Sequence, residues 1–205
     1  MNGFDAWLAY LFDRPADDDS WDGRPHAWLD RYAGQDTPVA AAQRIRELFG
    51  NAGTLLRPHS DDQVARGLLE IVDGGELHAL CSPRVPVVLR TGGLRSIVRL
   101  FAEVFAARIE VEHPRHLPKL QHACFMFFDI APIDLGDDTV LDVLEDTLAL
   151  PSVPCQRSAL HGLGHAYWKS PQQVPAIVDR WLARNRHAPA ELRDYAAGAR
   201  AGQVM

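Results

Sequence analysis

Cysteine is scarce in this chain of 205 residues, and its spacing excludes two common kinds of small stabilised domain. The three cysteines, Cys81, Cys124 and Cys155, lie far apart and form no CxxC pair. A disulfide framework needs an even set of cysteines, and a zinc knuckle needs closely paired ones. The sequence therefore predicts buried free thiols.

Basic residues are fewer than acidic ones, which argues against nucleic-acid partners. The chain holds 21 Lys and Arg against 27 Asp and Glu, for a net charge of -6. A nucleic-acid surface needs excess basic residues to neutralise phosphates, so we expect no nucleic-acid partner. Residues 1–37 hold eight Asp against three Arg, so most of the net charge lies at this end. Any charged partner is expected to be basic.

Long apolar runs are missing as well. No stretch approaches the roughly 20 apolar residues that span a bilayer, and the N-terminus lacks the basic region and cleavage site of a signal peptide. We therefore expect a cytoplasmic protein with no membrane partner. Its apolar fraction of 47% is ordinary for a globular chain, and its length suffices to bury a core. We expect one all-helical domain over residues 1–205.

Motifs for nucleotide binding and for hydrolase chemistry are absent: the sequence has no GxxxxGK[ST], no GxGxxG after a strand and no GxSxG. The segment "RTGGLRS", residues 90–96, could hold an anion at a helix N-terminus, although a helix-start loop is the commoner meaning. The first ligand positions of a calcium loop are occupied by Asp18, Ser20, Asp22 and Gly23. Leu29 stands where a bidentate Glu is required, so a solvated acidic turn is expected instead.

Many segments of the sequence show helical periodicity. Residues 1–35 are expected to form a short amphipathic helix followed by an acidic loop. The segments "DTPVAAAQRIRELFG" and "SDDQVARGLLEIVDGG" each have a capping residue at the start, one apolar stripe and glycine at the end, which predicts two helices. A helix is also predicted over residues 94–109, whereas residues 85–89 could form a short strand.

The region 113–205 is the most regular. "CFMFFDIAP" is expected to be a buried helix that ends near Asp129. Four further segments of about 12 to 16 residues follow, joined by short Pro-containing turns, with no alternating pattern between them. This arrangement predicts an all-α fold of stacked antiparallel helix pairs.

The segment from Cys155 to Leu182 resembles a HEAT-type helical repeat. The residue pairs in matching places are Ala159-Leu160, Leu163-Gly164 and Val174-Pro175. Gln156 replaces the arginine that is usual near the start of the first helix. The resemblance implies a HEAT-like α-α superhelix, whose members usually act as scaffolds or protein-binding surfaces. The chain otherwise resembles an uncharacterised bacterial protein family.

The sharpest chemical feature is "CQRSALHGLGHAYWKSP", which sets His161 and His165 four residues apart. At about 100° per residue, Arg157, His161, His165 and Trp168 share the helix face opposite Cys155. Two histidines at this spacing can bind one metal, as in HExxH proteases, but glycine replaces the catalytic glutamate. A third ligand would have to come from elsewhere, and the obvious source is the segment that contains Glu112, His113, His116, His122 and Cys124, although no sequence feature places it near His161. Three interpretations stay open: a helix packed on both sides, a recognition surface, or a metal site.

Three further residues have both a structural and a functional interpretation. Asp129 follows an aromatic run, where desolvation could raise its pKa for acid-base work, although a cap or an arginine pair is commoner. Gly162 and Gly164 each cost about 1 kcal/mol of helix stability relative to alanine. Close approach of another helix is the expected reason for both glycines.

These observations predict a non-enzymatic protein-interaction module, adaptor-like or scaffold-like, without a cofactor. The predicted binding residues are Arg157, His161, His165 and Trp168, and the expected partner is another protein or a second copy of the chain. One alternative is a metal-dependent enzyme that uses His161 and His165. The other is a toxin-neutralising, immunity-type protein.

Overall fold

The described part of the chain is all-helical. The structure is a computed structural model that describes residues 3–13, 37–110 and 118–204, and no strand occurs within these ranges. The α-helices are α1 (Gly3–Phe12), α3 (Pro38–Gly50), α4 (Ala52–Leu55), α5 (Asp61–Asp73), α6 (Val87–Leu100), α7 (Ala106–Arg108), α8 (Lys119–Ile130), α9 (Asp138–Leu148), α10 (Val153–Ala166), α11 (Gln173–Arg184) and α12 (Ala190–Arg200). A 3-10 helix, η1 (Glu76–Cys81), and a π-helix, η2 (Phe101–Phe105), complete the list.

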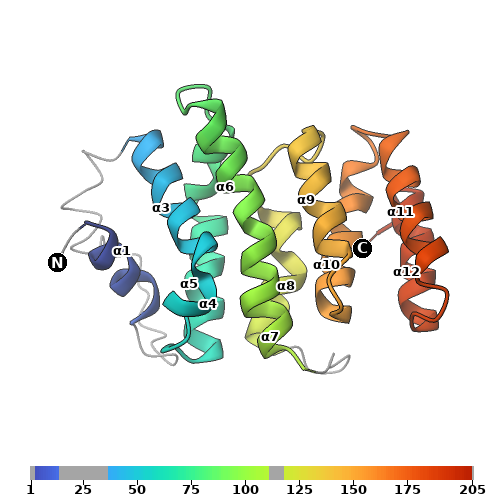
Figure 1. Ribbon diagram of the computed structural model, residues 1–205, viewed down its shortest axis with the longest axis horizontal. Helices are drawn as coiled ribbons and strands as arrows, with labels where there is room; N and C mark the ends of the chain where they lie inside the picture. Colours follow the sequence, from blue (N-terminus) through green and yellow to red (C-terminus); the bar gives the residue numbers. More distant parts are fainter. Residues whose placement is uncertain (1–2, 14–36, 111–117, 205) are drawn as a thin grey trace.

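The main helices form two layers (Figure 1). In the front layer α3 contacts α6, α6 contacts α9, and α9 contacts α11. In the back layer α5 contacts α8, α8 contacts α10, and α10 contacts α12. Each front helix is followed along the chain by a back helix, so successive helices pair across the layers. The prediction of an all-α fold of packed helices is confirmed.

Helix starts follow the capping residues in the sequence. The Thr37 hydroxyl accepts a hydrogen bond from the Ala40 amide at 3.1 Å at the start of α3. Ser60 and Gln63 form a reciprocal capping box at the start of α5. That helix ends before Gly74, and Gly75 takes the left-handed φ of 80° that glycine tolerates without strain. These local signals explain why both predicted helices have the expected bounds.

The predicted strand at residues 85–89 is wrong. Pro86 caps α6, which begins at Val87, so these residues open a helix. The fixed φ of proline suits a helix start and removes an amide that would have no partner there. Val87 and Val88 are 63% and 81% exposed, so their β-branched side chains are in solvent rather than in a pleated core. Residues 90–96 lie inside α6, so neither the expected helix-start loop nor the alternative, an anion site at a helix N-terminus, is found there.

Phenylalanine rings join the two layers at the middle of the chain. Phe101 is fully buried, and its ring centroid lies 4.9 to 5.3 Å from those of Phe105, Phe127 and Phe128. The helix predicted at 94–109 continues through this point, but it passes through the π-turn η2. Buried apolar residues from Trp7 to Ala199 belong to one cluster. Within the described ranges no helix is long and apolar enough to cross a membrane.

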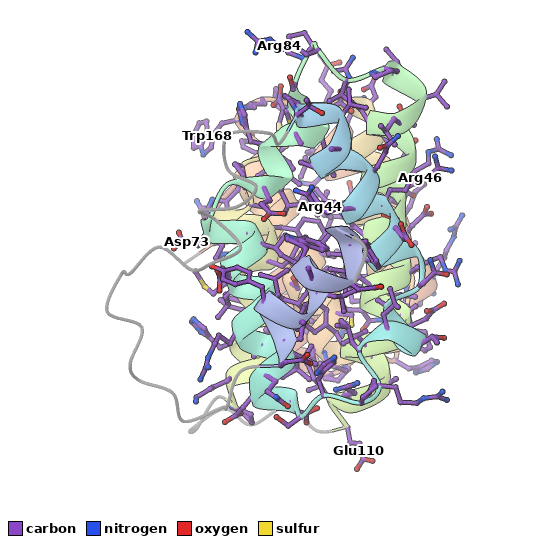
Figure 2. The ribbon with its side chains drawn as sticks, turned by 90° about the vertical axis from the view of Figure 1, so that its left-hand side faces the viewer. Arg44, Arg46, Asp73, Arg84, Glu110 and Trp168 are labelled. Carbon is purple, nitrogen blue, oxygen red and sulfur yellow. The ribbon has the colours of Figure 1, made fainter. Side chains whose placement is uncertain are left out.

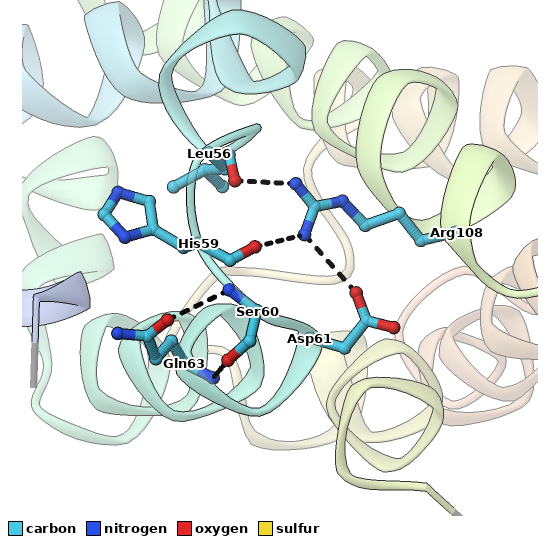
Figure 3. A network of polar contacts seen from close by, with 6 residues as sticks. All are labelled: Leu56, His59, Ser60, Asp61, Gln63 and Arg108. Atoms are coloured by element: carbon cyan, nitrogen blue, oxygen red, sulfur yellow. Dashed lines mark hydrogen bonds and ion pairs between the residues drawn. The ribbon is translucent and has the colours of Figure 1, made fainter. Parts of the chain in front are cut away.

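Arg108 at the end of α7 holds the turn between α4 and α5 (Figure 3). Its guanidinium donates hydrogen bonds to the Leu56 carbonyl at 2.6 Å and the His59 carbonyl at 3.1 Å. It also lies 3.3 Å from the Asp61 carboxylate. The side chain is 19% exposed, so these carbonyls have limited access to water. One guanidinium thus orders a turn that lies some 50 residues away in sequence.

We expect Arg108→Met to lower the free energy of unfolding by about 1–3 kcal/mol, because it leaves partly buried carbonyls without their donor. Urea denaturation of the purified chain measures this loss. Arg95→Met is the matched control, since Arg95 is 65% exposed and lies 3.5 Å from Asp142. Exposed pairs of this kind contribute about 0–1 kcal/mol. Equal losses in the two variants would contradict the role assigned to Arg108.

Candidate functional site

Three potential metal ligands from two helices converge at the back layer. His161 and His165 come from α10, and Asp129 comes from α8. His165 Nε2 lies 3.0 Å from Asp129 Oδ1 and 3.1 Å from His161 Nε2. His161 Nε2 is 4.0 Å from the same carboxylate oxygen. We call these residues the Asp129–His161–His165 cluster.

Close packing of α8 against α10 brings the cluster together. A Cβ placed on Gly162 would lie 2.8 Å from the Cβ of Phe128 and 2.7 Å from a methyl carbon of Leu144. Only glycine therefore fits at this position with the helices at their present spacing. Ser158 fixes the same contact by donating a hydrogen bond of 2.6 Å to the carbonyl of Cys124. This packing holds Asp129, on α8, close to the two histidines on the neighbouring helix α10.

The third helix of the site, α12, supplies Tyr195. Its hydroxyl lies 2.6 Å from His161 Nδ1. The Arg157 guanidinium carbon lies 5.2 Å from the centre of the Tyr195 ring, a cation-π distance. On the α8 side the Phe125 ring centroid is 4.5 Å from that of His161. Residues from α8 and α12 therefore contact the His161 imidazole, and the Tyr195 hydroxyl contacts its Nδ1 atom.

Burial controls the protonation of this site. The pKa of His161 is lowered, chiefly because burial penalises the charged imidazolium and also because His165 is close; Asp129 opposes the shift. Burial raises the pKa of Tyr195 to about 12, and Asp129 adds to the increase while Arg157 reduces it. At neutral pH His161 is therefore a neutral imidazole, and Tyr195 keeps its proton.

The hydrogen-bond partners assign the tautomers. When both imidazoles are neutral, only one of the two facing Nε2 atoms can carry a proton. The nearby Asp129 carboxylate favours that proton on His165. His161 then carries its proton on Nδ1, donates it to the Tyr195 oxygen and keeps a lone pair on Nε2. A nitrogen lone pair and a carboxylate oxygen thus point at one site.

Comparison with known proteins gives no relative from which to infer a function. No family model, curated protein or solved structure matches the chain. The HEAT-like pattern is therefore a resemblance carried by residues such as Ala159, Leu163 and Val174 alone. The geometry of the site carries the functional inference.

The four predicted binding residues separate into two environments. His161 is 3% exposed, so it is an internal residue and not part of a contact surface. Arg157 is half-buried, and His165 is exposed. Trp168 is 78% exposed, and Figure 2 shows its indole projecting on the opposite side of the view from Arg46 of α3. Arg157, His161 and His165 lie on α10, whereas Trp168 lies in the turn after the helix ends at Ala166, so the four residues do not form one helix face.

The segment expected to supply a third ligand contributes none among the described residues. Glu112, His113 and His116 lie outside the described residues, as do the residues of the possible calcium loop. His122 is exposed on α8, Cys124 is buried, and neither belongs to the cluster. Asp129 takes this place instead. Sequence reasoning had singled out Asp129 but gave it no partner, and it missed Tyr195 altogether.

A hollow of about 280 Å³ lies between α9 and α11. Its carboxylates are already paired: Glu145 with Arg180 at 2.7 Å, Asp142 with Arg95 at 3.5 Å, and Asp138 with the Gln173 amide at 3.0 Å. Two of these contacts join α9 to α11, and the contact with Arg95 joins α9 to α6. The hollow is therefore a weaker candidate site than the cluster on the back layer.

Proposed function

We propose that this chain is a protein-binding module made of HEAT-like stacked helix pairs, which binds a basic protein partner through the back layer around Trp168. The observation that carries the proposal is the exposed indole of Trp168, which contacts the Tyr167 ring. Tryptophan and arginine are enriched at binding hot spots.

The back layer offers a pre-ordered surface. Tyr167 packs edge-on against Trp168, with ring centroids 5.5 Å apart. Arg157 is held over the Tyr195 ring, so its guanidinium loses little freedom when a partner binds. Arg157 lies on α10 and Tyr195 on α12, and the contact between these helices keeps their spacing fixed. Tyr167 and Trp168 directly follow the end of α10. Such pre-organisation favours recognition of a rigid partner surface.

Charge supports a basic partner. The net charge of -6 attracts a protein of opposite charge and increases the rate of encounter. A basic toxin that this chain neutralises, or a basic protein that it recruits, would have this chemistry. Six of the eight Asp in residues 1–37 lie in residues 14–36, outside the described residues, so only their sequence supports this step.

Pull-down from a native lysate, followed by binding measurements with the isolated partner, tests the proposal. We expect Trp168→Ala, alone and with Arg157→Ala, to weaken binding about 30-fold or more, as loss of a hot spot of about 2 kcal/mol would. Val88→Ala is the control, because Val88 is 81% exposed on the front layer. Retention of every partner by the double variant would show that the proposed face is wrong. Light scattering that showed a dimer disrupted by Trp168→Ala would replace the foreign partner with a second copy.

A further inference from the structure

We propose that the Asp129–His161–His165 cluster is a binding site for one divalent transition-metal ion of the zinc, cobalt or iron(II) type. This site is independent of the protein-binding role proposed above. It rests on ligand geometry, on the tautomer of His161 and on the exposure of the two outer ligands.

The donor atoms have nearly the spacing that one ion requires. Metal–nitrogen and metal–oxygen bonds of about 2.0–2.2 Å, at angles near 90–110°, place neighbouring ligand atoms about 2.9–3.5 Å apart. The edges from His165 to Asp129 and from His165 to His161 measure 3.0 and 3.1 Å. The third edge, from His161 to Asp129, is 4.0 Å. Rotation of the Asp129 carboxylate, whose torsion is soft, shortens this edge.

The two histidines match a known helical arrangement of ligands. Residues at i and i+4 lie on one helix face, and this spacing lets two imidazoles reach the same ion. The carboxylate comes from the neighbouring helix α8. Two nitrogens and one carboxylate oxygen suit first-row transition ions better than calcium or magnesium, which prefer oxygen ligands.

The surroundings of His161 fit a ligand that is held in place before the ion arrives. A metal-bound imidazole commonly donates its other N–H to a polar partner, which fixes the ring and its tautomer. Tyr195 Oη lies 2.6 Å from His161 Nδ1, as such a partner requires. The imidazole is buried, and Phe125 packs beside its ring. His161 thus has a fixed orientation with Nε2 turned toward the two other ligands.

Exposure gives the ion a path to the site and leaves room for further ligands. The side chains of His165 and Asp129 are 38% and 30% exposed, whereas that of His161 is 4% exposed. The inner ligand is therefore fixed and the outer two face solvent. Three protein ligands leave at least one coordination position for water or another small donor. When the ion binds, the His165 proton moves through solvent from Nε2 to Nδ1, and the Nε2 lone pair of the neutral imidazole binds the ion.

The test is calorimetric titration of the full chain, purified without a metal-affinity tag, with Zn²⁺ and separately with Co²⁺. We expect one equivalent to bind, visible absorption bands from bound Co²⁺, and a rise in melting temperature with excess Zn²⁺. His165→Ala and Asp129→Asn, both on the exposed side of the site, are expected to weaken binding more than about 100-fold. Tyr195→Phe, which removes only the hydroxyl beside His161, is expected to weaken it about 10- to 100-fold.

The matched control is His122→Ala, which removes an exposed histidine from α8, the helix that carries Asp129. It should leave the affinity and the melting shift unchanged. Binding of less than a tenth of an equivalent by the wild-type chain would overturn the proposal. Equal affinity of wild type, His165→Ala and Asp129→Asn would also overturn it, since the ion would then be bound elsewhere. Trp168→Ala should bind Zn²⁺ as the wild-type chain does. Failure of the protein-binding proposal would therefore not change the result for metal binding.

Discussion

Phe101→Ala is expected to lower the free energy of unfolding by about 3–5 kcal/mol. Phe101 is fully buried at the junction of η2 with α8, where its ring is near those of Phe105, Phe127 and Phe128. Truncation removes the transfer energy of the ring and leaves a cavity that these large, interlocked neighbours cannot fill. The aromatic contacts add about 0.5–1.5 kcal/mol per pair beyond the buried area.

Chemical denaturation followed by circular dichroism measures this loss, with Trp168→Ala as the control. That variant removes a larger aromatic ring, but Trp168 is 78% exposed, so the change in unfolding free energy should stay within about 0.5 kcal/mol. A loss below about 1 kcal/mol for Phe101→Ala would show that the two layers are not joined at this cluster. The pair of variants separates burial from aromatic character, because both lose a ring and only one loses a buried ring.

Helix starts with a side-chain cap could be placed from the sequence, whereas the start of α6, which has none, could not. Ser60 caps α5 and Thr37 caps α3 because their hydroxyls reach amides within the same turn, which needs no tertiary information. The start of α6 was missed because Val87 and Val88 are typical of strands. Pro86 and packing of the rest of the helix decide the outcome there. The π-turn at η2 has no sequence signal of its own.

The candidate site shows the same division. His161 and His165 are paired by helical periodicity alone, so their proximity could be predicted. Asp129 lies 32 positions before His161, and only the packing of α8 on α10 brings the two together. Residue type points to the segment rich in His and Cys, which contributes no member of the cluster among the described residues, whereas the order of the helices points to Asp129. Asp129 near the C-terminal end of the preceding back-layer helix was the available signal.

His161 is buried, as expected of a helix packed on both sides, one of the three interpretations that the sequence leaves open. A helical wheel places it opposite the apolar face of Cys155, where a polar residue of a surface helix would be in solvent. The structure buries it because α10 is an inner helix, with α8 on one side and α12 on the other. A helix flanked on both sides has two buried edges in addition to its apolar face. Its polar residues then need partners within the protein, and Tyr195 and His165 supply them.

The second large effect concerns the spacing of these helices. We expect Gly162→Leu to lower the free energy of unfolding by about 3 kcal/mol, the upper part of the range for overpacked cores. A Cβ at this position already lies 2.8 Å from the Phe128 Cβ, which the backbone of α8 fixes. The contact can be relieved only if α8 moves away from α10. The gain in helix propensity, about 1 kcal/mol, offsets only part of the cost.

Thermal and urea denaturation measure this effect, and Gly50→Leu is its matched control. Gly50 is the last residue of α3, and a Cβ there meets nothing within 4 Å, so its replacement should be neutral or slightly stabilising. Because Asp129 lies on α8 and both histidines on α10, separation of these helices also lengthens the distances between the donor atoms. Gly162→Leu should therefore bind Zn²⁺ more weakly than Gly50→Leu does. A stable Gly162→Leu variant would mean that α8 and α10 are not in the close contact on which the site depends.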